Sequence, residues 1–388
     1  AVVDAALRDY AAAGGIVVVV GAGGQVPQPF AGWARAWMTS ESHQDLAEAY
    51  RLGAGRVRYV SADTLAGLST DQWERWVDAR ITDTQSSRQR LDASAAEGRL
   101  PMLETLRVPT RTLLFIMVVF TLLIGPVNIV ALSFLKRRMW LLWTIPLIAL
   151  IFAGGVLAYS ILSEGVRPRA KTVAVTLLDQ KTRQAVTLGM TGYYAPLTPG
   201  DGLRYDERTE VTPQSGDSSY GYGYGDGGRQ RTMDVTNGQH LASGWVIARV
   251  PAHFALRQVE NRRERLDISR NDDGGLTVVN GLGLPIKRLL IADSLGGVFE
   301  VRDLTAGGST SAEAIESSTT PQVFLLEDIS RRGTLEKVNE INRTPDNYLF
   351  RGGYVALLDN ASLLEPGLDN LVSHEVTGVV VGRWAEGE

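Results

Sequence analysis

Two long runs of apolar residues lie close together in the chain, from Leu113 to Phe134 and from Met139 to Leu162. Neither run contains Asp, Glu, Lys, Arg or His. Each run exceeds the ~20 residues that a helix rising about 1.5 Å per residue needs to cross ~30 Å of hydrocarbon. The pattern predicts a transmembrane hairpin over residues 112–163, which leaves two water-soluble parts of the chain on one side of a membrane.

The turn between the runs carries the cations Lys136, Arg137 and Arg138, with Trp140 and Trp143 beside them. Short cationic loops favour the cytoplasmic side, and Trp rings favour the membrane interface, so we expect a cytoplasmic tip and two extracytoplasmic soluble parts. More cations flank the hairpin than occupy its tip, which leaves the opposite orientation open; they are Arg99, Arg107, Arg111, Arg167, Arg169 and Lys171.

Helix-breaking and polar residues interrupt the first run at Gly125, Pro126 and Asn128. Such residues at membrane depth can mark a transport path, but no ionisable side chain accompanies them here. We interpret Gly125, Pro126 and Asn128 as a membrane kink with close packing between the two helices.

The segment before the hairpin alternates helical and strand patterns, which predicts α/β structure over residues 1–82. The expected elements are a helix around Ala6 to Ala11, a buried strand at Ile16 to Val20, a helix at Glu41 to Tyr50, a strand at Gly55 to Val60 and a helix at Ser69 to Ile81. Ser69 and Gln72 have the spacing of a capping box at the start of the last helix. Residues 83–111 are expected to form a polar linker or helical stalk.

After the hairpin, short strand patterns separated by turn residues predict one or two β-sandwich domains over residues 170–388. The Asn280-Gly281 and Gly296-Gly297 pairs predict two hairpins, and hence a three-strand meander over residues 274–304. A helix is expected at Thr334 to Ile341. The expected strands are Thr172–Leu178, Ala185–Leu188, Trp245–Val250, Leu276–Val279, Ile286–Ile291, Val298–Val301, Tyr354–Leu358 and Val376–Val381.

Composition limits the chemistry of the soluble parts. A net charge of −4 over 388 residues argues against a nucleic-acid partner, and the chain has no cysteine for a thiol nucleophile or a sulfur-bound metal. The four histidines, His43, His240, His253 and His374, stand apart from one another and from triad partners. The glycines after Ile16–Val20 lack the remaining positions of a nucleotide loop, and Tyr220 to Gly225 is typical of a surface loop. We therefore expect no cofactor, no metal and no catalytic residue.

Several short motifs resemble one known group of proteins. They are Tyr10-Ala-Ala-Ala-Gly-Gly-Ile-Val-Val-Val-Val-Gly21, Gly53-Ala-Gly-Arg-Val-Arg-Tyr-Val-Ser-Ala-Asp63, the helix with Trp73 and Trp76, and Gly125-Pro-Val-Asn128. Together they resemble the end of the class I glutamine-amidotransferase-like domain of uncharacterised bacterial membrane proteins. That group often carries von Willebrand A-like domains and is encoded near AAA ATPase chaperones of the MoxR type.

The resemblance implies a partial amidotransferase-like layer in a bacterial membrane protein. With the predicted transmembrane hairpin and the predicted all-β sandwich region, we expect a multidomain protein of the bacterial inner membrane. Active amidotransferases use a Cys nucleophile, and this chain contains no cysteine. We expect a non-catalytic envelope protein that binds the lipid bilayer and partner proteins as a scaffold. Two alternatives stay open: an enzyme whose catalytic half precedes Ala1, where the chain is expected to lack its beginning, and an accessory subunit of a transporter.

Overall fold

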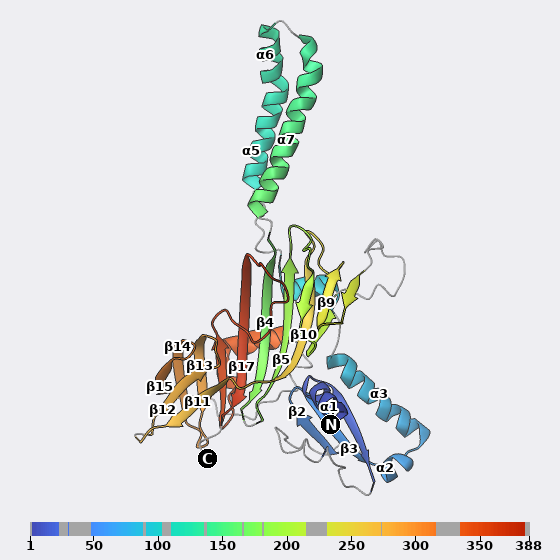
Figure 1. The fold of residues 1–388 in the computed structure, drawn as a ribbon, viewed down its shortest axis with the longest axis vertical. Helices are drawn as coiled ribbons and strands as arrows, with labels where there is room; N and C mark the ends of the chain where they lie inside the picture. Colours follow the sequence, from blue (N-terminus) through green and yellow to red (C-terminus); the bar gives the residue numbers. More distant parts are fainter. Residues whose placement is uncertain are drawn as a thin grey trace.

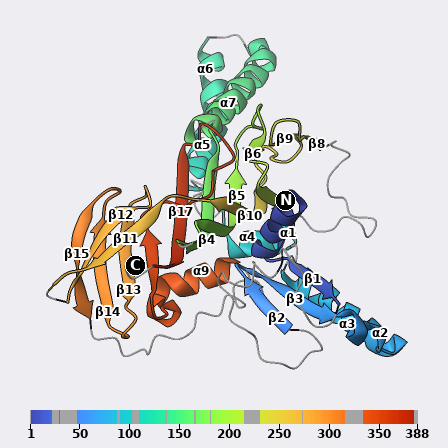
Figure 2. The same ribbon diagram turned by 60° about the horizontal axis from the view of Figure 1, so that its bottom comes forward.

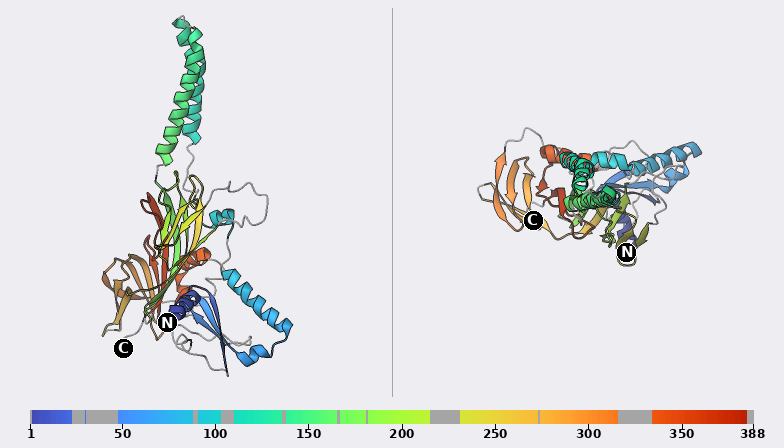
Figure 3. Two further views of the ribbon diagram at one scale, coloured as in Figure 1. Left: turned by 45° about the vertical axis from the view of Figure 1, so that its right-hand side comes forward. Right: turned by 90° about the horizontal axis from the view of Figure 1, so that it is seen from above.

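The computed structural model describes residues 2–22, 30, 48–87, 91–102, 110–135, 138–164, 167–180, 182–214, 231–272, 274–315 and 334–384. A helical hairpin projects from one end of a β-rich body, and the first and last described residues, Val2 and Trp384, lie in that body (Figures 1 and 3).

The hairpin confirms the two apolar runs as helices. Two of the described helical segments are long and apolar enough to cross a membrane, Leu114–Phe134 and Leu141–Tyr159, and hardly any of either is buried against other protein. The first segment is α5 (Thr110–Leu122), a π-helical turn (Leu123–Val127) and α6 (Asn128–Phe134), and the second follows a short 3-10 turn (Arg138–Trp140) as α7 (Leu141–Glu164).

One large mixed sheet of eleven strands forms the centre of the body, and neighbouring strands run antiparallel except for one parallel pair, β17 with β4. In spatial order the strands are β11 (Arg265–Arg270), β12 (Leu276–Gly281), β15 (Ser309–Ile315), β14 (Val298–Leu304), β13 (Ile286–Ala292), β16 (Gly353–Leu358), β17 (Ser373–Arg383), β4 (Arg169–Asp179), β5 (Gln184–Tyr194), β10 (Ala252–Asn261) and β7 (Thr209–Pro213). A three-stranded sheet, β6 (Leu203–Tyr205), β9 (Gln239–Ser243) and β8 (Thr232–Asp234), packs near the end of the body that faces the hairpin (Figure 1).

The sheet folds over at one end because β15 pairs with two different strands. Its first half pairs with β12 and its second half pairs with β14. The fold encloses an apolar core to which β11, β12, β13, β14 and β16 all contribute, with Leu266, Leu276, Leu289 and Tyr354 among its members. The strands expected after the hairpin are confirmed except Trp245–Val250, which is a turn in which Arg249 takes a left-handed backbone conformation.

The meander expected around Asn280-Gly281 is wrong. Strand β12 pairs with β11 and β15, and Gly281 continues the strand opposite Arg265 in place of turning. The side chain of Asn280 is buried and donates to the carbonyl oxygens of Leu284 and Thr305. It therefore links two segments of the chain and does not close a tight turn. The second expected hairpin is confirmed, since β13 and β14 pair directly around Gly296-Gly297.

The residues before the hairpin form a small α/β layer. Strand β1 (Ile16–Gly21) lies parallel to β3 (Gly55–Ser61), and β2 (Glu48–Leu52) lies antiparallel to β3. The helices are α1 (Val2–Ala12), α2 (Ala62–Ala66) and α3 (Thr70–Ser87). The expected capping box is confirmed, because Ser69 and Gln72 each bond the other's backbone N–H through their side chains.

The helix expected at Glu41 to Tyr50 is wrong at its end, because residues 48–50 begin β2; residues 41–47 lie outside the described part. This segment is a strand and not a helix because it pairs antiparallel with β3 and buries the side chain of Leu52. These tertiary contacts outweigh the local preference for a helix.

The segment expected to be a stalk packs against the body in part. Helix α4 (Ala93–Arg99) buries Ala96, and Leu100 after it is buried as well. Both belong to a core that also contains Val57 of the α/β layer, Val175 of β4 and Val338 of α9 (Thr334–Arg343). The expected helix at 334–341 is therefore confirmed, and Figure 2 shows α1, α4 and α9 gathered against the foot of the large sheet. The α/β layer and the large sheet share one core.

Candidate functional site

The predicted membrane kink is a helix-to-helix contact. Pro126 lies inside the π-helical turn, and Asn128 directly follows that turn. The amide nitrogen of Asn128 lies 3.0 Å from the hydroxyl oxygen of Thr144 on α7, and the amide oxygen lies 3.2 Å from the same hydroxyl. The side chain of Asn128 is buried between the helices, so the polar group at this depth has a partner. The sequence did not indicate Thr144 as that partner.

The predicted tip residues are described only in part. Lys136 and Arg137 lie outside the described residues, and Arg138 begins the 3-10 turn that ends at Trp140. Trp140 and Trp143 are both exposed, as amphipathic rings at a membrane interface would be.

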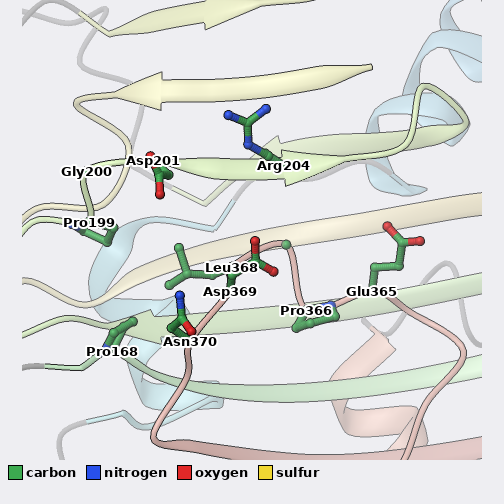
Figure 4. Close-up of a pocket in the computed structure, with 12 residues that line it drawn as sticks. Pro168, Pro199, Gly200, Asp201, Arg204, Glu365, Pro366, Leu368, Asp369 and Asn370 are labelled. Atoms are coloured by element: carbon green, nitrogen blue, oxygen red, sulfur yellow. The ribbon is translucent and has the colours of Figure 1, made fainter. Parts of the chain in front are cut away.

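A pocket of about 420 Å³ lies at the end of the body nearest the hairpin. Its walls are the loop between β5 and β6, the loop before β17, and Pro168, which precedes β4. Figure 4 shows Asp201 and Arg204 on one side of the pocket and Glu365, Asp369 and Asn370 on the other. These residues come together because β4 pairs with both β5 and β17, although the two loops are more than 160 residues apart.

Backbone hydrogen bonds hold the two loops together. The N–H of Arg204 donates to the carbonyl of Gly367 at 2.7 Å, and the N–H of Val372 donates to the carbonyl of Pro168 at 2.9 Å. Gly367 has a φ of +67°, and a Cβ at this position would lie 2.4 Å from the ring of Tyr205. Glycine is therefore required at 367 both by the backbone conformation and by the approach of the ring.

Two buried tyrosines lie behind the pocket wall formed by Pro366 and Gly367. The hydroxyl oxygens of Tyr193 and Tyr205 lie 2.6 Å apart, and Tyr193 also donates to the carbonyl of Pro366. Both side chains are buried. Burial raises the pKa of Tyr193 and that of Tyr205 well above the ordinary tyrosine value, so both hydroxyls are neutral hydrogen-bonding groups that fix the loop.

The pocket lining can hold a polar group by charge and shape. Three carboxylates and one guanidinium surround it, together with proline and glycine backbone. Among the residues that the structure describes, the lining contains no Ser, Thr, His or Lys side chain to act as nucleophile or base beside them. Among the described residues no group of three His, Asp or Glu side chains is placed to hold a metal ion.

Each histidine in the described residues bonds a group of the fold. His253 is buried, and its Nε2 lies 2.9 Å from the carbonyl oxygen of Leu100. His374 bonds the hydroxyl of Thr172, and His240 bonds the carbonyl of Asp201. His43 and the segment Tyr220 to Gly225 lie outside the described residues.

Two turn signals in the sequence mark the walls of the pocket. The stretches Pro199-Gly-Asp-Gly202 and Glu365-Pro-Gly367 are both strong turn signals, but a single sequence does not reveal that the two turns meet.

Comparisons with known proteins leave the family of this chain open. No protein-family model matches it, and no curated protein matches it. Among solved structures, the yeast delta-COP-I mu-homology domain complexed with a Dsl1 WxWxV peptide is similar at 8% identity and a TM-score of 0.24, covering 55% of this chain and 95% of that one. The same yeast domain without the peptide gives 7% identity and a TM-score of 0.24, covering 55% and 94%.

Proposed function

We propose that this protein is a membrane-anchored, non-catalytic scaffold of the bacterial cell envelope. Two spans hold it in the inner membrane, and its body binds partner proteins outside the cytoplasm. The observation that supports this most directly is the shared core. Ala11 and Val57 of the α/β layer, Leu100 of the predicted stalk and Val338 of α9 are buried in one cluster with strands of the large sheet.

The shared core supports a scaffold because it makes one body out of segments before and after the hairpin. Arg257 of β10 adds a polar contact across the same junction, since its guanidinium donates to the carbonyl of Ala13 at 3.0 Å. A single body presents its outer surfaces in a fixed geometry relative to one another. Fixed geometry is what a binding component of an assembly requires.

The use of the polar side chains supports a non-catalytic role. His253, His374 and His240 each bond a group that holds the fold, and the tyrosines behind the pocket wall are buried and neutral. Catalytic groups need a pKa near the working pH and access to a substrate. The histidines and the two tyrosines instead make hydrogen bonds that hold the fold together.

The orientation is testable because the natural chain contains no cysteine. Single cysteines are introduced as Leu295→Cys, at the end of the body away from the hairpin, and Met139→Cys, at the hairpin tip; both side chains are more than four-fifths exposed. A membrane-impermeant maleimide is added to intact spheroplasts. We expect Leu295→Cys to react at once and Met139→Cys to react only after permeabilisation. The reverse pattern would place the body in the cytoplasm and overturn the proposed orientation.

Partner binding is tested by mild crosslinking in the same cells, followed by purification of the full chain. The scaffold proposal predicts recovery of envelope proteins with soluble domains. Recovery of multispanning proteins alone would favour the accessory subunit of a transporter.

A further inference from the structure

Three loops at the hairpin end of the body each expose one large apolar side chain. Leu197 follows β5, Val250 precedes β10 and Val372 precedes β17, and they are 54%, 48% and 56% exposed. The body buries most of its leucine and valine side chains in its cores. The three residues are named here the apolar rim.

Hydrogen bonds join the three loops into one surface. The N–H of Arg249 donates to the carbonyl of Ala195 at 2.7 Å, and the N–H of Ala248 donates to the hydroxyl of Thr198 at 3.2 Å. These bonds tie the loop of Val250 to the loop of Leu197. The loop of Val372 joins them across the pocket, whose lining includes both Pro199 and Asn370.

The register of the sheet places all three loops at the same end. Arg169, the first residue of β4, pairs with Tyr194 at the end of β5 and with Ser373 at the start of β17. Ala252 at the start of β10 pairs with Tyr193. The rim therefore surrounds the point where the chain leaves the hairpin and enters the sheet.

That point lies close to the membrane anchor. Helix α7 ends at Glu164, and Pro168 follows four residues later. Four residues span at most about 14 Å even when fully extended. The N–H of Val372 donates to the carbonyl of Pro168. This bond holds one rim loop to the chain only four residues after the end of α7 (Figure 1).

The backbone at Arg249, the residue before Val250, is held in a costly conformation. Arg249 has a φ of +64°, which non-glycine residues rarely adopt, and its N–H is fixed by the carbonyl of Ala195. The turn keeps Val250 at the surface in place of the strand that the sequence indicated at Trp245 to Val250.

The charges around the rim are mixed. The cations are Arg167, Arg169, Lys171, Arg204 and Arg249, and the anions are Asp201, Glu365, Asp369 and Glu375. A surface with both signs does not select for anionic lipid as a polybasic cluster does. The recognising chemistry is therefore apolar, and it fits the interfacial region of a zwitterionic bilayer.

We propose that the apolar rim of Leu197, Val250 and Val372 inserts into the lipid interface of the leaflet from which the hairpin emerges. The body is then seated on the bilayer by its own loops as well as suspended from two helices. This inference rests on the proposed membrane anchoring. Seating fixes the orientation of the body, and with it the direction in which the membrane-distal surfaces face.

The test uses single-cysteine variants of the full chain labelled with an environment-sensitive fluorophore and reconstituted in phosphatidylcholine vesicles. The rim variants are Leu197→Cys, Val250→Cys and Val372→Cys. Leu150→Cys, exposed on the lipid-facing side of α7, is the membrane control, and Leu295→Cys, at the far end of the sheet, is the aqueous control. We expect blue-shifted emission and quenching by shallow spin-labelled lipid at all three rim positions, deep quenching at 150 and neither effect at 295.

The two possible failures are distinguishable. Rim labels that behave like the label at 295, with position 150 quenched, would overturn the seating and leave the anchoring in place. A label at 150 that is not quenched would overturn both.

A second measurement avoids the fluorophore, which can itself favour an interface. Hydrogen exchange of the loops is compared between vesicles and detergent for the natural chain and for the triple variant L197S/V250S/V372S. Seating predicts slower exchange of residues 195–202 in vesicles for the natural chain only. Equal exchange of the two proteins in vesicles would overturn the proposal.

Discussion

The hydroxyl oxygens of Tyr193 on β5 and Tyr205 on β6 lie 2.6 Å apart beneath the loop before β17. Tyr193 donates its proton to the carbonyl of Pro366, so the hydrogen between the two rings comes from Tyr205. This chain of bonds connects the large sheet, the small sheet and the pocket wall. The position of that wall therefore depends on two buried side chains that are not among the residues described as lining the pocket.

The number of bonds that each hydroxyl makes predicts which substitution lowers the unfolding free energy more. Tyr193→Phe leaves both the Tyr205 hydroxyl and the Pro366 carbonyl without this partner, and we expect a loss of about 1–3 kcal/mol of unfolding free energy. Tyr205→Phe removes one bond only, with an expected loss of roughly 0.5–1.5 kcal/mol. Denaturant unfolding of the full chain in detergent measures both. A larger effect of Tyr205→Phe would contradict the arrangement in which the Tyr193 hydroxyl takes part in both bonds.

The same tyrosines predict a loss of stability at alkaline pH. Burial raises the pKa of Tyr193, Tyr205 and Tyr354 above the ordinary value of 10.0, while the unfolded chain titrates near that value. The folded state therefore binds more protons than the unfolded state above pH 10.0. The stabilisation is complete below that pH and is lost as the pH rises. We expect absorbance of tyrosinate from these side chains to appear only with unfolding.

Local sequence patterns predicted the elements that are determined by residues close to one another in the sequence. The two apolar runs, the five-residue strand from Ile16 to Val20 and the capping box at Ser69 all have their determining residues within a few positions. The strands after the hairpin were predicted for the same reason. Asn280-Gly281 was misinterpreted because the partners of Asn280, Leu284 and Thr305, are determined by the chain crossing and not by the dipeptide.

The pocket and the shared core depended on long-range pairing. Arg169 and Ser373 become neighbours only when β4 and β17 pair in parallel, and no periodicity in either strand indicates which partner it takes. The core contact between Leu100 and the sheet was missed because the surrounding segment is polar enough to form a solvent-exposed stalk. Tertiary burial decided its position over local composition.

Asp293 in the turn between β13 and β14 fixes the folded-over end of the sheet. One of its carboxylate oxygens lies 2.9 Å from a guanidinium nitrogen of Arg270 on β11, and the other accepts the N–H of Gly297 at 2.6 Å. Burial alone would raise the pKa of Asp293, but the bonds to Arg270 and Gly297 outweigh it and lower the pKa below the ordinary 3.8.

Replacement of the Asp293 carboxylate is expected to destabilise the folded-over end of the large sheet. Asp293 is buried, and Asp293→Asn removes the charge that strengthens its bond to Arg270, so we expect a loss of about 1.5–3 kcal/mol in denaturant unfolding. Asp267→Asn is the matched control, because Asp267 and Arg265 form an ion pair that is mostly exposed and is worth roughly 0–1 kcal/mol. The contribution of Asp293 is present above pH 3.8 and is lost as the pH falls further, so the variant should lose that pH dependence. Equal effects of the two substitutions would contradict the assignment.

His253 predicts a weaker attachment of the α4 segment in mild acid. Burial lowers the pKa of His253 below the ordinary 6.5, although the Leu100 carbonyl and the Glu97 carboxylate act in the opposite direction. The unfolded chain therefore takes up the proton first, and stability declines as the pH falls below 6.5. Unfolding free energies are measured from about pH 7 to about pH 5, the range in which histidine changes charge. We expect His253→Gln to flatten the decline; an unchanged slope in the variant would assign it to another group.

Asn128 and Thr144 predict a measurable coupling between the two spans. Hydrogen bonds between membrane helices contribute about 0.6–2 kcal/mol, since the alternative is a polar group in hydrocarbon. We expect Asn128→Leu and Thr144→Val each to reduce the free energy of association of the two helices by about that amount. The double variant should lose no more association free energy than either single variant. Thr121→Val is the control, because the Thr121 hydroxyl bonds the carbonyl of Met117 within its own helix. Energy transfer between dyes at Leu114→Cys and Leu157→Cys, both exposed in the natural chain, reports separation of the helices in mixed micelles. Additive effects of the two substitutions would show that the side chains act independently and that the kink at Pro126, not the polar pair, brings the helices together.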